Sequence, residues 1–267
     1  MTYLAQGHPI ENGVGSEPHT FEGAQLMKFS ARILYLGLSL IVIAHSSAYA
    51  QQANGRDAGQ TFPPVEQASF HQVVFANDDF AVLNNRYPPG GNSGFHTHYR
   101  DIFYVAIQAA PQSGQRPGQQ LTEAPITPAG AAGYNAIGGE PRTHRIVNSD
   151  TGPSQFIVIE MRRAAPRGDE VSSRESAPEY VQIIDNERVR AWRLILAPGQ
   201  SAPSISQGGN GVRVVVRGGL LTTTTPGVLD QTFALRAGEF AVQAGRSIRA
   251  LRNSGAETIE LVELELK

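Results

Sequence analysis

Short apolar runs bounded by proline and glycine recur along the chain and predict antiparallel β-strands. Two examples are FIVI at residues 156–159 and VRVVV at residues 212–216. Both are rich in β-branched side chains, which favour strands over helices. No segment after residue 50 carries a convincing helical period of apolar positions. The pattern therefore predicts an all-β protein built from short strands.

The chain repeats itself beyond residue 60, which predicts two related domains. The segment FHQVVFANDDFAVLNNRYPPG ends at Gly90 and resembles YVQIIDNERVRAWRLILAPG, which ends at Gly199, 109 positions later (199 − 90). Further on, HRIVNSDTGPSQFIVIEM begins at His144 and resembles RALRNSGAETIELVELEL, which begins at Arg249, 105 positions later (249 − 144). Self-similarity of this kind indicates a duplicated structural unit.

The N-terminal part of the chain is typical of a bacterial secretory signal peptide. Lys28 and Arg32 precede an apolar run at residues 33–44, and Ala48-Tyr49-Ala50 is a small-x-small cleavage signal. The run is shorter than the roughly 20 residues that span a bilayer, so we expect no membrane span after cleavage. We expect cleavage near Ala50 and a periplasmic or secreted protein, with Met27 as a candidate translation start.

These patterns divide the chain into six segments. They are an upstream extension at 1–26, a signal peptide at 27–50, a flexible lead-in at 51–64, a first domain at 65–162, a polar linker at 163–178 and a second domain at 179–267.

Charge and composition narrow the chemistry. Lys and Arg number 22 against 24 Asp and Glu, and no basic stripe is present, which argues against a nucleic-acid partner. The chain has no cysteine, so stability must come from packing, and His, Asp, Glu and Tyr remain as metal ligands.

Two histidine motifs resemble those of the cupin family. Gly90 is followed after five residues by His96-Thr97-His98, as in the front half of the motif G-x5-H-x-H-x3or4-E-x6-G. His144 and Asn148 match the ending H-x3-N of the second cupin motif. With the duplication, the chain from about residue 65 to residue 267 resembles a bicupin. The resemblance implies two jelly-roll β-barrels in tandem, each with a pocket at its mouth.

The resemblance also implies a metal site at three histidines. His96 and His98 share one strand face because side chains alternate, and cupin geometry would bring His144 from a distant strand. Three imidazoles suit a divalent metal; we expect iron, with zinc, manganese, nickel and copper as alternatives. His71 has no motif context and is expected on the surface.

The fourth cupin ligand, a glutamate, is missing. Its position falls on Ile102 or Phe103, and the nearby acid, Asp101, could coordinate only if a bulge changed the strand phase. Tyr104 has the parity to line the pocket, and Asn148 is a further pocket candidate. A centre of three histidines with open positions resembles the all-histidine iron centres of some thiol, diketone and gentisate dioxygenases in the cupin superfamily.

The second copy lacks these ligands. After Gly199 it reads QSAPSISQ, and Arg249 replaces His144. We expect no metal site there, and a structural role or homodimer formation instead. Arg249 either faces an anionic ligand, or it pairs with a strand carboxylate or lies at the rim of the barrel, and the second interpretation is favoured. Trp192 is expected in the core.

Two functions follow. The first is a metal-dependent, dioxygenase-like enzyme acting on a small organic substrate. The alternative is a non-catalytic periplasmic module that binds a small molecule or a metal. The sequence does not decide between catalysis and binding.

Overall fold

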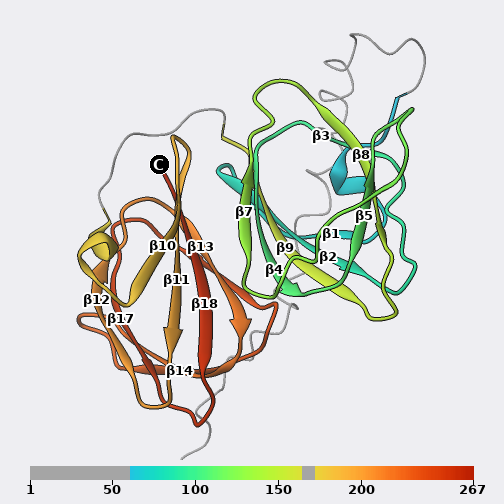
Figure 1. Ribbon diagram of the computed structural model, residues 1–267. Coiled ribbons are helices and arrows are strands. Elements are labelled where there is room, and N and C mark those ends of the chain that lie inside the picture. Colours follow the sequence, from blue (N-terminus) through green and yellow to red (C-terminus); the bar gives the residue numbers. More distant parts are fainter. Residues whose placement is uncertain (1–60, 164–171) are drawn as a thin grey trace, which may run out of the picture. The chain divides into compact units, whose positions relative to one another are not determined.

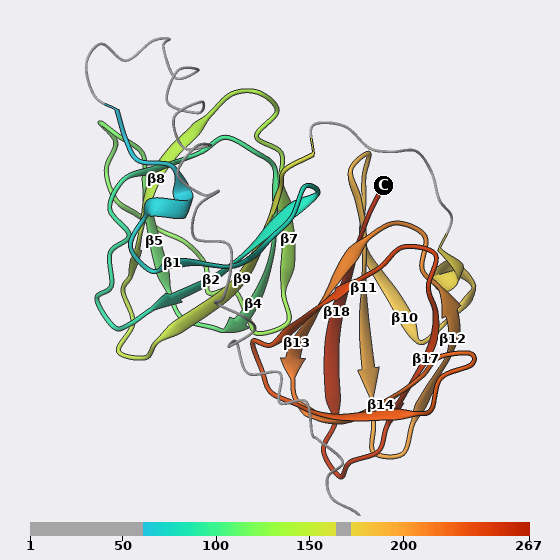
Figure 2. The same ribbon diagram turned by 180° about the vertical axis from the view of Figure 1, so that it is seen from behind.

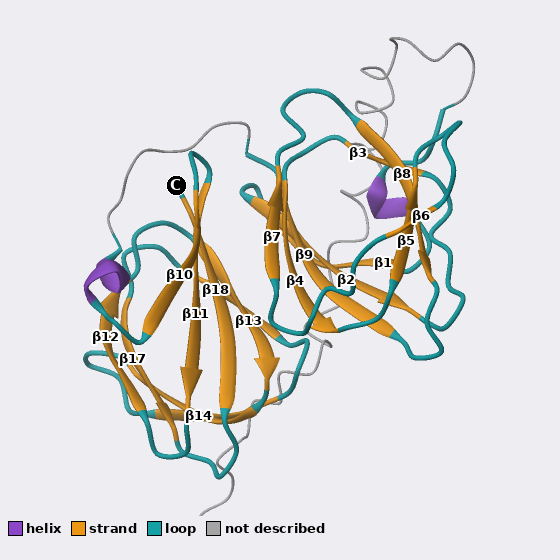
Figure 3. Cartoon of the chain, in the orientation of Figure 1, coloured by secondary structure: helices purple, strands orange, loops and turns teal. Residues whose placement is uncertain are grey.

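The computed structural model describes residues 61–163 and 172–267 (Figure 1). The expected upstream extension, signal peptide and most of the expected lead-in lie outside these residues, as do residues 164–171 of the expected linker. The described residues contain strands, two short 3-10 helices and no α-helix (Figure 3). The all-β class predicted from the alternating pattern is therefore confirmed. None of the helices among them is long and apolar enough to cross a bilayer.

The strands between residues 71 and 161 form a five-stranded and a four-stranded sheet, here called the first sheet pair. The five-stranded sheet has the order β1-β2-β9-β4-β7 and the four-stranded sheet has the order β3-β8-β5-β6. The strands are β1 His71–Ala76, β2 Phe80–Tyr87, β3 His96–His98, β4 Ile102–Gln108, β5 Gln112–Gln115, β6 Thr122–Glu123, β7 Ala132–Asn135, β8 Arg142–Asn148 and β9 Ser154–Met161. The helix η1, Val65–Gln67, precedes them.

The strands between residues 180 and 266 form the second sheet pair with the same plan. Its five-stranded sheet has the order β10-β11-β18-β13-β16, and its four-stranded sheet has the order β12-β17-β14-β15. The strands are β10 Tyr180–Asp185, β11 Val189–Leu196, β12 Ser201–Ser206, β13 Gly211–Arg217, β14 Gly219–Thr224, β15 Gln231–Leu235, β16 Phe240–Gln243, β17 Ile248–Asn253 and β18 Ile259–Leu266. The helix η2, Ser173–Ser176, precedes them.

The two sheet pairs match in detail, as the sequence repeat predicts. β1 pairs with β2 through His71 and Asn85, and β10 pairs with β11 through Tyr180 and Leu194, so both partners differ by 109 positions (180 − 71; 194 − 85). Both hairpins have a register shift at the corresponding place. The paired strands lie side by side in both views of the chain (Figures 1 and 2). All-antiparallel sheets in this order are consistent with jelly rolls.

The central strands of the five-stranded sheets are largely buried on both faces, which explains the apolar runs within them. In β4, Phe103 belongs to a core cluster shared with strands of the second sheet pair, and Ile102 belongs to a separate cluster of the first pair. The described residues all belong to one compact unit of the chain, so the two sheet pairs can share a core. Because successive strand residues face opposite sides, a strand covered on both sides carries apolar residues on both, or buried polar ones with partners, such as Glu263 and Glu265 of β18.

Candidate metal centre

The structure brings His96, His98 and His144 together. β3 and β8 are antiparallel neighbours, with His96 directly opposite His144 and His98 opposite Arg142. One ring nitrogen from each histidine lies within 4.8 Å of the other two. His96 and His98 are buried, and His144 is half-buried. Strand alternation therefore places the first two, and strand pairing supplies the third.

The hydrogen bond of His96 fixes which of its ring nitrogens carries a lone pair. His96 Nδ1 lies 3.1 Å from the carbonyl oxygen of Gly94, to which it can only donate, so its Nε2 carries the lone pair. This buried Nε2 has no hydrogen-bond partner. The Nε2 atoms of His98 and His144 lie 3.1 Å apart. An imidazole whose remote N–H binds a carbonyl is the usual arrangement for a metal-ligating histidine, and His96 has it. Three imidazole nitrogens close together are a donor set that fits a divalent cation.

The site keeps its imidazoles neutral. Burial, and then the neighbouring histidines, lower the pKa of His98 to about 2 and that of His144 to about 3. Burial also lowers the pKa of His96. Neutral imidazole is the form that coordinates metals, so these rings are ready to bind at neutral pH without losing a proton.

His71 is not on the surface, and this expectation from the sequence was wrong. Its side chain is buried, and its ring centroid lies 4.5 Å from that of His96. Its Nδ1 lies 2.9 Å from the Ser69 carbonyl oxygen, and its Nε2 lies 3.1 Å from the Tyr87 hydroxyl. Burial, and then His96, lower its pKa to about 4. The repeat held a signal for this burial, because His71 aligns with the aromatic Tyr180.

Asp101 is not part of the histidine group. One carboxylate oxygen accepts a hydrogen bond from the Tyr134 hydroxyl at 2.6 Å, and the other accepts from the backbone N–H groups of Ile137 and Gly138 at 2.7 and 3.2 Å. Burial alone would raise the pKa of Asp101, but these hydrogen bonds and Arg188 lower it. The carboxylate therefore stays ionised and holds a loop in place.

The other two pocket candidates of the first copy also have structural contacts. Tyr104 packs within an apolar cluster, with its ring centroid 6.3 Å from that of Phe156. Asn148 is fully buried, and its amide donates to the carbonyl oxygens of Tyr87 and Gly152, at 3.1 and 2.8 Å. The amide of Asn148 thus ties two turns together.

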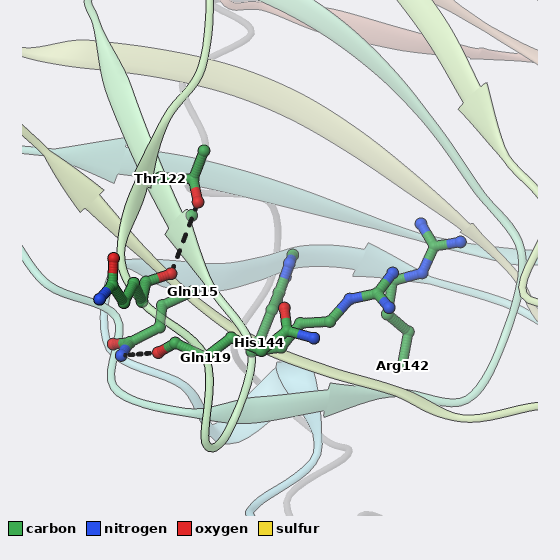
Figure 4. A pocket seen from close by; sticks show the side chains of 8 residues that line it. Gln115, Gln119, Thr122, Arg142 and His144 are labelled. Atoms are coloured by element: carbon green, nitrogen blue, oxygen red, sulfur yellow. Dashed lines mark hydrogen bonds between the residues drawn. The ribbon is translucent and has the colours of Figure 1, made fainter.

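A cavity of about 280 Å³ opens beside His144. Its walls are the β5–β6 hairpin, residues 114–122, and the side chains of Arg142 and His144 on β8 (Figure 4). The hairpin is held by its own hydrogen bonds, including one from Gln115 Nε2 to the Gln119 carbonyl oxygen at 2.6 Å. This glutamine- and glycine-rich segment therefore forms one wall of the cavity beside His144.

In the second copy, Ile205, Gln207 and Arg249 stand at the positions of the three histidines (96 + 109, 98 + 109 and 144 + 105). β12 and β17 pair Ile205 with Arg249, as β3 and β8 pair His96 with His144. Arg249 Nη2 donates to Gln207 Oε1 at 2.9 Å, and it lies 3.8 Å from Glu263. Arg249 therefore pairs with a strand carboxylate, as the favoured interpretation predicts.

Arg174 of η2 fills the interior beside this pair. Its guanidinium donates to Glu263 at 2.6 and 2.8 Å, to Glu265 at 2.9 Å and to Gln207 at 2.6 Å. It also lies over the ring of Trp192, 5.0 Å from the centroid. Trp192 is fully buried in the core of this sheet pair, as expected. Arg174 itself lay in the expected linker, where no pattern predicts a buried arginine.

The sheet topology is that of a cupin-like fold, and the three-histidine group lies within it. No model of a known protein family matches the sequence, and no curated protein matches it. Among solved structures, AerE from Microcystis aeruginosa aligns with 74% of this chain and 91% of its own, at 11% identity and a TM-score of 0.53.

Two further solved structures share this fold. Protein Ylba from E. coli aligns with 78% of this chain and 88% of its own, at 12% identity and a TM-score of 0.52. Salicylate 1,2-dioxygenase from Pseudaminobacter salicylatoxidans aligns with 73% of this chain and 72% of its own, at 12% identity and a TM-score of 0.50. At such identities the likeness establishes the fold, and the chemistry must be argued from this chain's own residues.

Proposed function

We propose that this protein is a metal-dependent oxygenase acting on a small organic molecule, with His96, His98 and His144 as the metal ligands. The observation that carries the proposal is the convergence of three neutral imidazole nitrogens within 4.8 Å, one of them buried without a partner. Such an unpaired polar atom is costly to bury unless something binds it.

Iron is the metal proposed, because three histidines without a carboxylate resemble the all-histidine centres of cupin dioxygenases. A divalent iron held by three imidazoles offers open coordination positions for dioxygen and substrate. Zinc, manganese, nickel and copper suit the same nitrogen donors, so the metal found after expression depends on availability as well as on affinity.

The chain's own residues have separate roles in this proposal. Gly94 fixes the ring orientation of His96 through its carbonyl oxygen. His71, packed on His96, shields that ring from water and is itself held by Tyr87. The cavity beside His144 gives a small molecule access to the histidines. Residues of the first sheet pair therefore orient the ring of His96 and exclude water from it.

The test is the metal content of the purified protein, followed by oxygen uptake. We expect about one divalent metal per chain in the wild type and almost none in a His96→Ala/His144→Ala variant. Asp101→Asn is the matched control, because it alters a nearby acid outside the group and should keep its metal. Absence of metal in the wild type after reconstitution would contradict the proposal. Bound metal with no oxygen uptake across a substrate panel would favour the non-catalytic binding module.

We also propose that the protein is exported to the periplasm. The support is the basic start, short apolar run and Ala48-Tyr49-Ala50 signal in the sequence. Intact mass spectrometry of a periplasmic fraction should give a mature chain beginning near Gln51. Retention of the preceding residues would rule out cleavage at this site.

A further inference from the structure

The charged side chains that line the cavity beside His144 are all positive. Arg116 and Arg142 are among its lining residues, and no acidic residue is. In the described part of the chain, neither arginine side chain has an ion pair or a hydrogen-bond partner. The other polar side chains of the wall are neutral and come from glutamine, threonine and the histidine itself. Two unpaired guanidinium groups around one cavity give it a positive potential.

The position of Arg142 connects this charge to the histidines. Arg142 lies two residues before His144 on β8 and directly opposite His98 on β3, so it shares a strand face with His144. It is half-buried, whereas Arg116 lies exposed on the β5–β6 hairpin. The two arginines thus stand on different segments, one at the depth of the histidines and one further out. A ligand that contacted both would be held beside His144.

The neighbouring Arg145 shows that the two arginines differ from an ordinary surface cation. Its guanidinium donates to Gln115 and lies 5.2 Å from the centroid of the Phe95 ring. Arg145 therefore has partners that hold it outside the cavity. The partly buried guanidinium of Arg142 loses hydration, and an anion can restore its hydrogen bonds through the planar fork of donors.

We propose that this cavity binds a small organic anion, with Arg116 and Arg142 recognising its carboxylate or phosphate group beside His144. The inference rests on the proposed function, since it names the class of substrate for the same site. The cavity has room for roughly nine waters at about 30 Å³ each, which suits a ligand of similar atom number. Benzoate and phenyl phosphate are probes of this size, and benzamide is the neutral counterpart of benzoate.

The experiment is calorimetric titration of metal-loaded full-length protein with the three probes. We expect at least one of the two anions to bind ten-fold or more tightly than benzamide. An Arg116→Gln/Arg142→Gln variant should lose at least ten-fold in affinity for that anion and keep its affinity for benzamide. Arg217→Gln is the matched control, because it removes one positive charge from the exposed surface of the second sheet pair and should change nothing. The tighter anion identifies the recognised group.

The two arginines and the metal are tested separately. Equal affinity for the anions and benzamide, or anion binding that survives the arginine substitutions, would overturn the inference even in a protein that holds its metal. Arginine-dependent anion binding in a chain that takes up no metal would support the inference and contradict the proposed oxygenase. The metal-free His96→Ala/His144→Ala variant, titrated in parallel, should retain the arginine-dependent part of the affinity.

Discussion

Replacing Arg174 by methionine is expected to destabilise the protein more than most single substitutions. Arg174 and its partners Glu263 and Glu265 are each almost inaccessible to solvent, with side-chain exposures of 1, 1 and 3%. Removing one partner from a buried ion pair leaves an uncompensated charge, which typically costs about 3–5 kcal/mol. The methionine replaces much of the apolar volume, so the main loss is electrostatic.

The remaining contacts place the expected cost near the lower end of that range. Glu263 keeps a hydrogen bond from Arg213 Nε at 2.7 Å, and Glu265 keeps one from the Gly209 N–H at 3.0 Å. Burial already raises the pKa of Glu265, so this carboxyl can take up a proton once the arginine is gone. We therefore expect a loss of about 3 kcal/mol.

Urea unfolding followed by tryptophan fluorescence measures this loss, because Trp192 lies against Arg174. With a slope of about 2 kcal/mol per molar urea, a loss of about 3 kcal/mol lowers the midpoint by about 1.5 M. The urea midpoint of Arg174→Lys should lie between those of the wild type and Arg174→Met, since an ammonium keeps the charge without the planar fork. Arg217→Gln, at an exposed ion pair, should shift the midpoint very little. A midpoint for Arg174→Met within about 0.3 M of the wild type would refute the electrostatic argument.

Three further predictions concern the first sheet pair. The pKa of His144 is lowered to about 3 from an ordinary 6.5, so between these values the unfolded chain binds more protons than the folded one. The contribution of His144 to stability is therefore complete above about pH 6.5 and is lost as the pH falls toward 3. Urea midpoints of metal-free protein should fall over that window. Tyr87→Phe removes the hydrogen bond to the buried His71 and should lower the free energy of unfolding by about 1–3 kcal/mol, checked by the same method. Asn148→Ala should cost about 2–4 kcal/mol through its lost bonds to backbone carbonyls, and the equivalent Asn253→Ala a similar amount; loss of metal without loss of stability in Asn148→Ala would show that the side chain acts on the site instead.

Most of what the sequence could predict about the histidine site came from the alternation of side chains along strands. Residues two apart on a strand share a face, so the spacing of His96 and His98 was enough to place both rings together. His144 could be added only through the family resemblance, because strand pairing between β3 and β8 brings together residues 48 positions apart (144 − 96). The repeat predicted the matching hairpins for the same reason, since equal patterns of buried positions require equal registers.

The features that the sequence did not predict concern side chains whose partners lie elsewhere in the fold. His71 begins a strand, and nothing local indicates that Tyr87 and His96 will cover it. Asn148 matches a motif position, but spacing does not tell which way an amide points or which carbonyls it meets. Arg174 lies in the segment predicted as a polar linker, and no local pattern shows that it meets the buried carboxylates of Glu263 and Glu265. In each case burial and hydrogen bonding were decided by tertiary contacts, which local patterns do not encode.

The two copies show how one backbone register can hold two different chemistries. In the first copy, His98 and His144 meet through ring nitrogens 3.1 Å apart, and at the corresponding positions Gln207 and Arg249 meet through an amide oxygen and a guanidinium 2.9 Å apart. Neutral imidazoles placed this way offer lone pairs to a cation, whereas the guanidinium has no lone pair to offer and requires acceptors. Glu263 supplies such an acceptor nearby. The framework therefore fixes where the two side chains meet, and the residue types decide whether imidazole nitrogens or a guanidinium stand at that place.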